Sequence, residues 1–255
     1  MNAIFALLTP AEFTAALLIA VCAGFVKGVV GFAMPLVLIS GLTSFVAPEL
    51  ALAGLILPTV VANLIQALRQ GPGAAWASIK LFRAFLCAGF VTLVLSAQLV
   101  RVIPDRALLL AISIPVIFFV GLQLSGSRFH LKGRSQRLEL SIGAFAGAIG
   151  GMSGIWGPPT VAYLTALGTA KQDQMRIQGV IYGLGALTLL GAHVGSGILR
   201  AETLPFSAAL VLPGAIGMWM GGKISDRIDQ HIFRRATLVV LLLVALNLLR
   251  RAIMQ

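Results

Sequence analysis

Charged residues are scarce in this chain, and acidic residues are the scarcest of them. Of 255 residues, 11% are charged and 8 are aspartate or glutamate. These acids lie in predicted loops or at the edges of apolar segments: Glu12, Glu49, Asp105, Glu139, Asp173, Glu202, Asp226 and Asp229. With no carboxylate deep in a predicted span, the sequence argues against a cation site built from carboxylates and against an intramembrane aspartyl protease.

The motifs of several common enzyme classes are also missing. The chain contains no HExxH, GxSxG, P-loop or CxxC pattern, and these patterns would supply a metal site, a nucleophile elbow, a phosphate cradle or a redox pair. Ser153 is followed by a glycine but has no plausible acid partner for serine hydrolysis. We therefore predict that the protein is not an enzyme and needs no cofactor.

Cysteine is rare, and an N-terminal basic region is missing. Cys22 and Cys87 both lie in apolar runs, so we expect buried thiols that behave as small hydrophobes, with no disulfide or metal pair. Lys27 is the first basic residue of the chain. Because a signal peptide starts with a positively charged region, a cleaved signal peptide is not expected.

Long apolar runs, in contrast, are abundant. The composition is 58% hydrophobic, and several runs reach the ~20 residues that span a bilayer as a helix. The sequence thus predicts an all-α polytopic membrane protein with the lipid bilayer as its surroundings. The net charge of +11 does not indicate nucleic-acid binding, because the basic residues cluster in short loops as membrane orientation signals do.

The apolar segments form two similar series on either side of a basic loop. The first series is Phe13–Phe45, Leu50–Leu68, Leu81–Val100 and Ala107–Ser125, and the second is Glu139–Gly168, Ile177–Leu199, Leu204–Gly222 and Ala236–Ile253. We therefore predict an N-terminal membrane repeat (1–125), a basic cytoplasmic loop (126–138) and a C-terminal membrane repeat (139–255). Each repeat would hold one broken segment and three transmembrane helices, within one integral membrane domain.

The first segment of each series carries the same glycine and proline spacing, G-x3-G-x2-G-x3-P. It comprises Gly24, Gly28, Gly31 and Pro35 in the first copy, and Gly147, Gly151, Gly154 and Pro158 in the second. Glycine and proline interrupt helices. Interrupted membrane segments at corresponding positions of two halves are typical of a transporter binding site, so we expect a substrate cavity between the two breaks near the middle of the membrane.

The broken segments are too long for one straight crossing. Phe13–Phe45 as a single helix would measure roughly 50 Å, whereas the hydrocarbon core is ~30 Å thick. A re-entrant hairpin, two short crossings or one tilted, kinked helix would each fit.

Basic residues favour the hairpin or the two short crossings. If each broken segment enters and leaves on one side, the predicted cytoplasmic side holds Arg69, Lys80, Arg83, Arg128, Lys132, Arg134, Arg137, Lys171, Arg176, Lys223, Arg227, Arg234 and Arg235. The other side then holds Arg101, Arg106, Arg200, Arg250 and Arg251. Since cytoplasmic loops carry the excess of Lys and Arg, we predict two inverted repeats with both termini outside the cytoplasm.

Lys27 is the strongest candidate for chemistry, because it stands inside an apolar run between Gly24 and Gly28. A charge at that depth is costly and marks a functional site by default, although a snorkelling lysine or a lysine neutralised by burial is the alternative. Backbone N–H groups freed by a broken helix also attract anions. We therefore predict an anion site built from Lys27, freed backbone groups and polar side chains.

The candidate residues come from the two breaks and from polar positions within the spans, such as Asn63 and Gln66, which share one helix face. The predicted substrate-binding residues are Lys27, Gly28, Gly31, Phe32, Pro35, Asn63, Gln66, Gly151, Ser153, Gly154, Trp156, Pro158, Gln178 and Tyr182. Lys27 and His193 are the candidates for proton coupling. The ordinary pKa of histidine lies near neutrality, and a buried lysine without an acid partner tends to lose its proton, which an anionic substrate would restore. For any polar residue taken alone, a hydrogen bond between helices is the alternative role.

With these motifs, the chain resembles the TauE/SafE sulfite-exporter family of membrane transporters. The resemblance rests on both glycine–proline motifs, the basic central loop and the segment Gly-Met-Trp-Met-Gly-Gly-Lys-Ile-Ser-Asp-Arg-Ile before the last span, and it covers nearly the whole chain. Phe32-Ala33-Met34 and Ile155-Trp156-Gly157 stand where the family usually has glycine runs.

The resemblance implies a secondary transporter of the bacterial inner membrane that exports a small anion by alternating access. Its substrate would be sulfite, an organosulfonate such as sulfoacetate, or a related carboxylate. An anion channel and a non-transporting subunit of a membrane assembly are the alternatives. The oligomeric state stays open, with a homodimer among the options.

Overall fold

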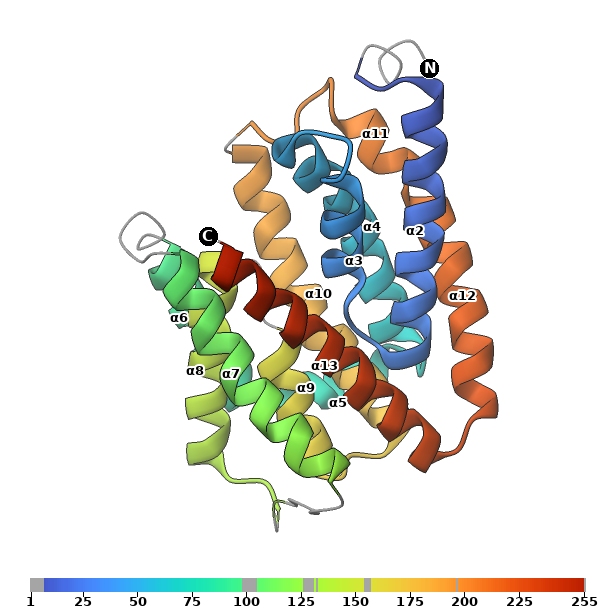
Figure 1. The fold of residues 1–255 in the computed structure, drawn as a ribbon. Coiled ribbons are helices and arrows are strands. Elements are labelled where there is room, and N and C mark those ends of the chain that lie inside the picture. Colours follow the sequence, from blue (N-terminus) through green and yellow to red (C-terminus); the bar gives the residue numbers. More distant parts are fainter. Residues whose placement is uncertain are drawn as a thin grey trace. The chain divides into compact units, whose positions relative to one another are not determined.

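The computed structural model describes residues 7–97, 105–125, 131, 133–153, 157–195 and 197–254, and in these ranges the chain is helical with no strand (Figure 1). Its helices are α2 (Pro10–Val30), α3 (Met34–Leu42), α4 (Pro48–Leu68), α5 (Pro72–Leu81), α6 (Arg83–Ala97), α7 (Asp105–Leu124), α8 (Gln136–Ser153), α9 (Gly157–Ala166), α10 (Lys171–Gly195), α11 (Leu204–Ala209), α12 (Val211–Arg227) and α13 (Gln230–Met254). The prediction of an all-α protein is confirmed.

The helices follow the same order in the two halves of the chain. A long helix and a short one (α2 and α3, then α8 and α9) precede a single long helix (α4, then α10). A short and a longer helix follow (α5 and α6, then α11 and α12), and one helix closes each half (α7, then α13). This order supports an internal repeat.

The compact units of the structure cut across these halves. Unit 1 comprises Met1–Gly71 and Gln178–Asp229, and unit 2 comprises Pro72–Ile177 and Gln230–Gln255. Each unit therefore combines helices from both halves, and α10 passes from one unit to the other at Gln178. The division into repeats at 1–125 and 139–255 stays a prediction, since it describes the sequence pattern and not the compact units.

In unit 1 the broken segment is a hairpin of unequal arms. The α2 helix begins with a capping box, in which the Thr9 side chain accepts a hydrogen bond from the Glu12 backbone N–H and the Glu12 side chain accepts one from the Thr9 backbone N–H. Its 21 residues give a length of about 31 Å, enough to cross the bilayer core, whereas the 9 residues of α3 give only about 14 Å. Leu7 before the hairpin and Ala47 after it line one cavity, so the chain returns to the end at which it entered.

The second broken segment also returns to its starting end, within unit 2. The backbone N–H of Leu131, which precedes α8, donates a 2.9 Å hydrogen bond to the carbonyl of Ala166 at the end of α9. Both segments thus return to the end at which they started, as do the two forms that the basic-residue pattern favours, the hairpin and the two short crossings.

Glycines pack the long arm of each hairpin against a helix from the other half of the chain. In unit 1, a Cβ on Gly24 would overlap the backbone of Gly214 in α12, and one on Gly217 would overlap the carbonyl of Val21. In unit 2, a Cβ on Gly147 would overlap the backbone of Gly89 in α6. Gly24 and Gly147 are the first glycines of the two repeated motifs, and they serve close helix packing as in other membrane bundles.

Short helices accompany two of the predicted spans. The described part of Leu81–Val100 is filled by α6, and α5 precedes it and meets it at an angle of 75° on either side of Phe82. Hydropathy did not reveal α5, because glycine and alanine fill its first turn after Pro72. The predicted span Leu204–Gly222 begins with the short α11, which a turn at Leu210 separates from α12, and the two together form one candidate span, Leu204–Arg227.

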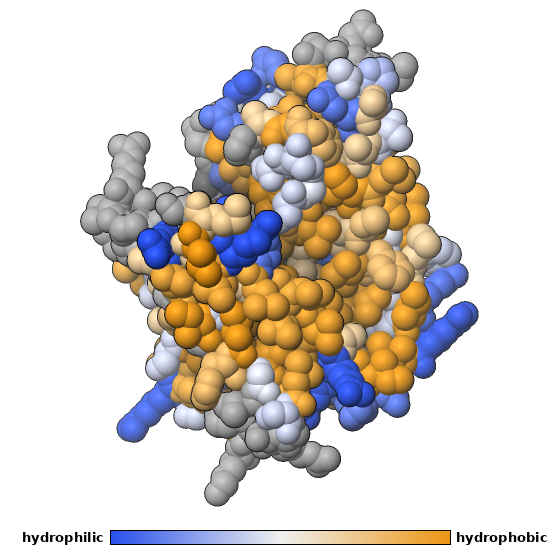
Figure 2. Space-filling model, viewed as in Figure 1, coloured by the Kyte–Doolittle hydropathy of each residue, from blue (hydrophilic) through white to orange (hydrophobic). Residues whose placement is uncertain are grey.

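The lengths and composition of the helices suit a membrane. Among the described residues, four helices are long and apolar enough to cross, or five if α5 and α6 count as one broken span. Apolar side chains dominate the visible helix faces and hydrophilic residues gather towards helix ends (Figure 2). Large exposed residues include Leu18, Phe118 and Leu212, each more than 60% accessible, which is expected where lipid replaces water.

The prediction of buried thiols is wrong. Cys22 and Cys87 are both exposed on the outer faces of α2 and α6. In a membrane protein the outside of a helix is as apolar as its inside, so hydrophobic surroundings in the sequence do not distinguish a lipid-facing cysteine from a buried one.

Candidate functional site

The break between α2 and α3 reverses the chain within three residues. Gly31 ends α2 in the left-handed region, with φ at 86°, and its N–H donates to the Lys27 carbonyl at 2.7 Å. Ala33 is also left-handed, with φ at 72°, a conformation that is strained for a residue with a Cβ. Because the chain turns here, the carbonyl of Gly31 accepts hydrogen bonds from side chains in place of a helical N–H.

Lys27 is buried in the last turn of α2, with 2% of its surface accessible. Its Nζ donates to Oδ1 of Asn63 at 2.6 Å and to the carbonyl of Gly31 at 3.4 Å. The same nitrogen lies 5.9 Å from the centroid of the Tyr182 ring, within range of a cation–π interaction. The ammonium therefore lies among neutral acceptors and an aromatic face.

Gln66 completes this arrangement. Its Nε2 donates to the Gly31 carbonyl at 3.0 Å. The Gly31 carbonyl therefore accepts hydrogen bonds from one side chain of α2 and one of α4. Five predicted site residues from three helices and the break thus meet in unit 1. We call them the Lys27 cluster, and its members are Lys27, Gly31, Asn63, Gln66 and Tyr182.

The Lys27 cluster holds a cation without a buried acid. Among residues whose burial is described, two charged side chains are buried, Lys27 and Glu139. Glu139 belongs to unit 2, where its carboxylate pairs with Arg134 at 2.7 Å. A buried ammonium without a carboxylate is expensive in a low dielectric, so the cluster suits an anionic ligand as its counter-charge.

Two more polar residues, each one helical turn from a member of this cluster, are buried without described hydrogen-bond partners. They are Gln178, whose amide nitrogen and oxygen both lack a described partner, and Thr59, whose hydroxyl lacks one. Gln178 is fully buried. Gln178 precedes Tyr182 by one turn of α10, and Thr59 precedes Asn63 by one turn of α4, so each shares a helix face with a cluster member. Because unpaired buried polar groups are rare, they mark a place where a polar ligand can bond.

The fit of α10 against α4 supports this placement. A Cβ on Gly179 would press on the backbone of Ala67, and one on Gly183 would lie 3.7 Å from the Asn63 side chain. Gln178 was a predicted site residue, but Thr59 was missed. The spacing of four residues between Thr59 and Asn63, which places both on one helix face, was the signal that could have revealed Thr59.

Some predicted residues of the first break take other places. Phe32 is buried within the break and Pro35 is half-buried in the first turn of α3. A Cβ on Gly28 would overlap the carbonyl of Met218 in α12. The contact of Gly28 is therefore with a neighbouring helix.

The residues of the second break belong to unit 2. Gly151 and Ser153 lie at the end of α8, and Pro158 is buried at the start of α9. Gly154 and Trp156 lie outside the described residues. The expected cavity between the two breaks stays a prediction.

His193, the second candidate for proton coupling, lies in the last turn of α10 and is half-buried. It is about 16 Å beyond Tyr182 along the helix axis, by the rise per residue. His193 is therefore separate from the Lys27 cluster.

Unit 2 contains a polar network that the sequence did not reveal. The Arg134 Nε donates to Oε1 of Glu139 at 2.7 Å, and Tyr163 donates to the same oxygen at 3.4 Å. The Arg134 guanidinium also bonds to the Leu81 carbonyl and lies 4.5 Å from the centroid of the Phe82 ring. The network thus connects the bend between α5 and α6 to α8 and α9, and its closed ion pair points to a structural role.

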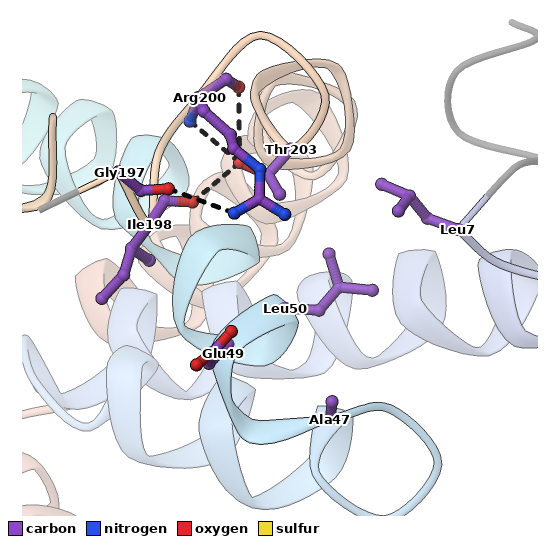
Figure 3. A pocket seen from close by; sticks show the side chains of 8 residues that line it. All are labelled: Leu7, Ala47, Glu49, Leu50, Gly197, Ile198, Arg200 and Thr203. Carbon is purple, nitrogen blue, oxygen red and sulfur yellow. Dashed lines mark hydrogen bonds between the residues drawn. The ribbon is translucent and has the colours of Figure 1, made fainter.

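A cavity of about 290 Å³ lies at the end of unit 1 where the first hairpin enters and leaves (Figure 3). Its lining is mixed, since Leu7, Leu50 and Ile198 accompany Glu49 and Arg200. The Arg200 side chain is exposed and pairs with Glu202 at 3.1 Å. This cavity contains none of the predicted site residues.

A comparison with protein families identifies the chain's relatives. The family model described as "Sulfite exporter TauE/SafE" matches residues 16–248. The chain belongs to this family. The match runs from α2 to α13, so it includes both broken segments and the whole Lys27 cluster. No curated protein and no solved structure matches the chain.

Membership of the TauE/SafE family makes the protein a multi-pass membrane transporter of an anion, and not an enzyme. The arrangement of the Lys27 cluster agrees with this class, because it offers a buried cation and neutral hydrogen-bonding groups but no nucleophile paired with a general base. Its chemistry is that of ligand binding.

Proposed function

We propose that this TauE/SafE protein exports a small anion, such as sulfite, an organosulfonate resembling sulfoacetate or a related carboxylate, by alternating access. The anion binds at the Lys27 cluster, where it neutralises the buried ammonium. The observation that carries the proposal is the position of Lys27, buried and bonded to Asn63 and Gly31 without a carboxylate. Gln178 and Thr59 supply further polar groups for the ligand.

The burial of the cluster favours a carrier over a channel. Lys27, Asn63 and Gln66 are each 2% accessible, and Gln178 is 0% accessible. An anion can reach these groups only after the surrounding helices move. Alternating access requires such a closed state, whereas an open pore would leave its lining accessible.

The cellular setting is a further part of this proposal. The uneven distribution of basic residues supports a bacterial inner-membrane location with the 126–138 loop in the cytoplasm, and the family description supports export. The exposed apolar faces of α12 and α13 would contact lipid. A homodimer is an additional proposal, which light scattering of the purified protein tests.

Counterflow in proteoliposomes tests the proposed function. Vesicles loaded with unlabelled sulfite or methanesulfonate should accumulate the labelled anion transiently and saturably, as a carrier does. Lys27→Met should abolish the counterflow, and Lys223→Met should retain it, because Lys223 lies outside the Lys27 cluster, beside Trp219 on α12. Non-saturating flux without counterflow would support a channel, and the absence of flux for every anion tested would contradict the proposal.

A further inference from the structure

We propose that the Lys27 cluster selects singly charged anions over doubly charged anions of the same size. This inference rests on the proposed function and adds the charge of the substrate to it. It follows from the number of charges buried in unit 1, where Lys27 is the single buried charged side chain among residues of described burial.

The helices packed around Lys27 contribute neutral groups. The α12 helix faces α2 with Gly214, Gly217, Met218 and Gly221, and α3 presents the apolar Met34 and Leu38. From α4 come the amides of Asn63 and Gln66, and from α10 comes the Tyr182 ring. Of these groups, the Tyr182 phenol is the one with an ionisable proton.

Another cation lies nearby on α4, but it is already compensated. Arg69 follows Gln66 by three residues, at the exposed end of the helix, and it forms an ion pair with Asp226 of α12. Its side chain is 45% accessible, so its field is screened by solvent. The positive charge available to a buried ligand is therefore the single charge of Lys27.

One monovalent anion neutralises this site, whereas a divalent anion leaves one negative charge without a partner. Leaving a charge uncompensated in a dry interior is strongly unfavourable. The remaining donors beside the cluster, the Gln178 amide and the Thr59 hydroxyl, are neutral and stabilise a second charge less well than a second cation would. The site therefore suits bisulfite, a sulfonate with a single charge or a monocarboxylate better than sulfate, the sulfite dianion or sulfoacetate, whose sulfonate and carboxylate give it two charges at neutral pH.

Methanesulfonate and sulfate test the inference, because they have nearly the same size and shape but differ by one charge. Their binding to the wild-type protein in nanodiscs is measured by calorimetry at the same ionic strength in the same background salt, so that competition from the background anion is equal for the two probes. Heats obtained with Lys27→Met are subtracted as the background. Methanesulfonate should bind at least about tenfold more tightly than sulfate, a difference of ~1.4 kcal/mol.

The outcomes separate this inference from the proposed function. Equal or tighter binding of sulfate would overturn the charge selectivity and leave an anion transporter. If neither anion bound, both the selectivity and the proposed anion site would be overturned.

A pH series provides a second test with the unmodified protein. Sulfite changes from bisulfite to the dianion near neutral pH, whereas methanesulfonate keeps one charge. As pH rises through neutrality, the apparent affinity for total sulfite should fall relative to that for methanesulfonate. An unchanged ratio of the two affinities would mean that the site accepts the dianion as readily as the monoanion, which would overturn the inference.

Discussion

A lysine is tolerated inside α2 because the break beside it supplies an acceptor that an unbroken helix would not. The Gly31 carbonyl and the Asn63 amide oxygen together hold Nζ, and neither carries a charge. The ammonium is therefore positioned but not neutralised. This distinction is the physical basis for an anion site at this residue.

The substitution Asn63→Asp tests that distinction. It puts a carboxylate at the position of an oxygen that lies 2.6 Å from the Lys27 Nζ, with almost no change in side-chain shape. A built-in counter-ion should lower anion affinity by about tenfold or more while the protein stays folded. Calorimetry and thermal unfolding in detergent measure the two effects.

Gln172→Glu, which adds the same charge on an exposed turn of α10, is the matched control. Wild-type affinity in Asn63→Asp would show that the ligand does not interact with Lys27.

At the scale of the elements, the break depends on the backbone freedom of Gly31. Gly31→Leu would force a branched side chain into the left-handed region, which costs about 1–2 kcal/mol, and would displace the carbonyl that holds Lys27 and Gln66. We expect counterflow to be lost while membrane insertion persists. Gly121→Leu is the control, because a Cβ there meets nothing within 4 Å. Wild-type transport by Gly31→Leu would remove the site from this break.

The buried ion pair of unit 2 makes a separate prediction about stability. Glu139→Gln removes the partner of Arg134, a group that also binds the Leu81 carbonyl at the bend between α5 and α6. Because the Arg134 side chain is 34% exposed, we expect a loss of about 1–3 kcal/mol, below the range for a fully buried pair.

Glu202→Gln breaks an ion pair with Arg200 in which both side chains are about 60% exposed, and it should cost less than about 1 kcal/mol. Chemical denaturation in detergent compares the two variants. Equal stability of both would show that the Arg134 network contributes nothing to the packing of unit 2.

The sequence predicted helices, the two broken segments and all five residues of the Lys27 cluster, because glycine, proline and intramembrane charge have direct conformational or solvation consequences. Other features depend on which face of a helix packs inwards. Cys22 shows this, since hydropathy does not separate lipid-facing from buried positions in an apolar chain. Thr59 shows it too, since hydropathy does not separate a hydroxyl in a binding site from a structural one. The bend at Phe82 is in contact with Arg134, a residue distant in sequence from it.

At the scale of the whole molecule, each compact unit is built from both halves of the chain. The hairpin α2–α3 packs through glycines on α12, and α8 packs in the same way on α6. This exchange suits an internal repeat, since the corresponding long arms contact corresponding partners. It also means that neither half would bury its glycine faces alone.

The orientation of the molecule gives a further prediction, because the excess of basic residues lies on one predicted side. In a background without Cys22 and Cys87, Gln255→Cys should react with an impermeant thiol reagent added to intact cells. Ser135→Cys should react only after the membrane is permeabilised. The reverse pattern would contradict both the cytoplasmic assignment of the 126–138 loop and the inverted topology.

The affinity of the purified protein for a monovalent anion, with and without Lys27, tests the central claim most directly. Lys27→Met should weaken methanesulfonate binding by about a hundredfold or more, equivalent to ~3 kcal/mol. Lys27→Arg should not restore it, because guanidinium differs in size and geometry from the ammonium that Asn63 and Gly31 hold. Lys223→Met should bind like the wild type. Equal affinity of wild type and Lys27→Met would contradict the account and leave Lys27 as a structural lysine.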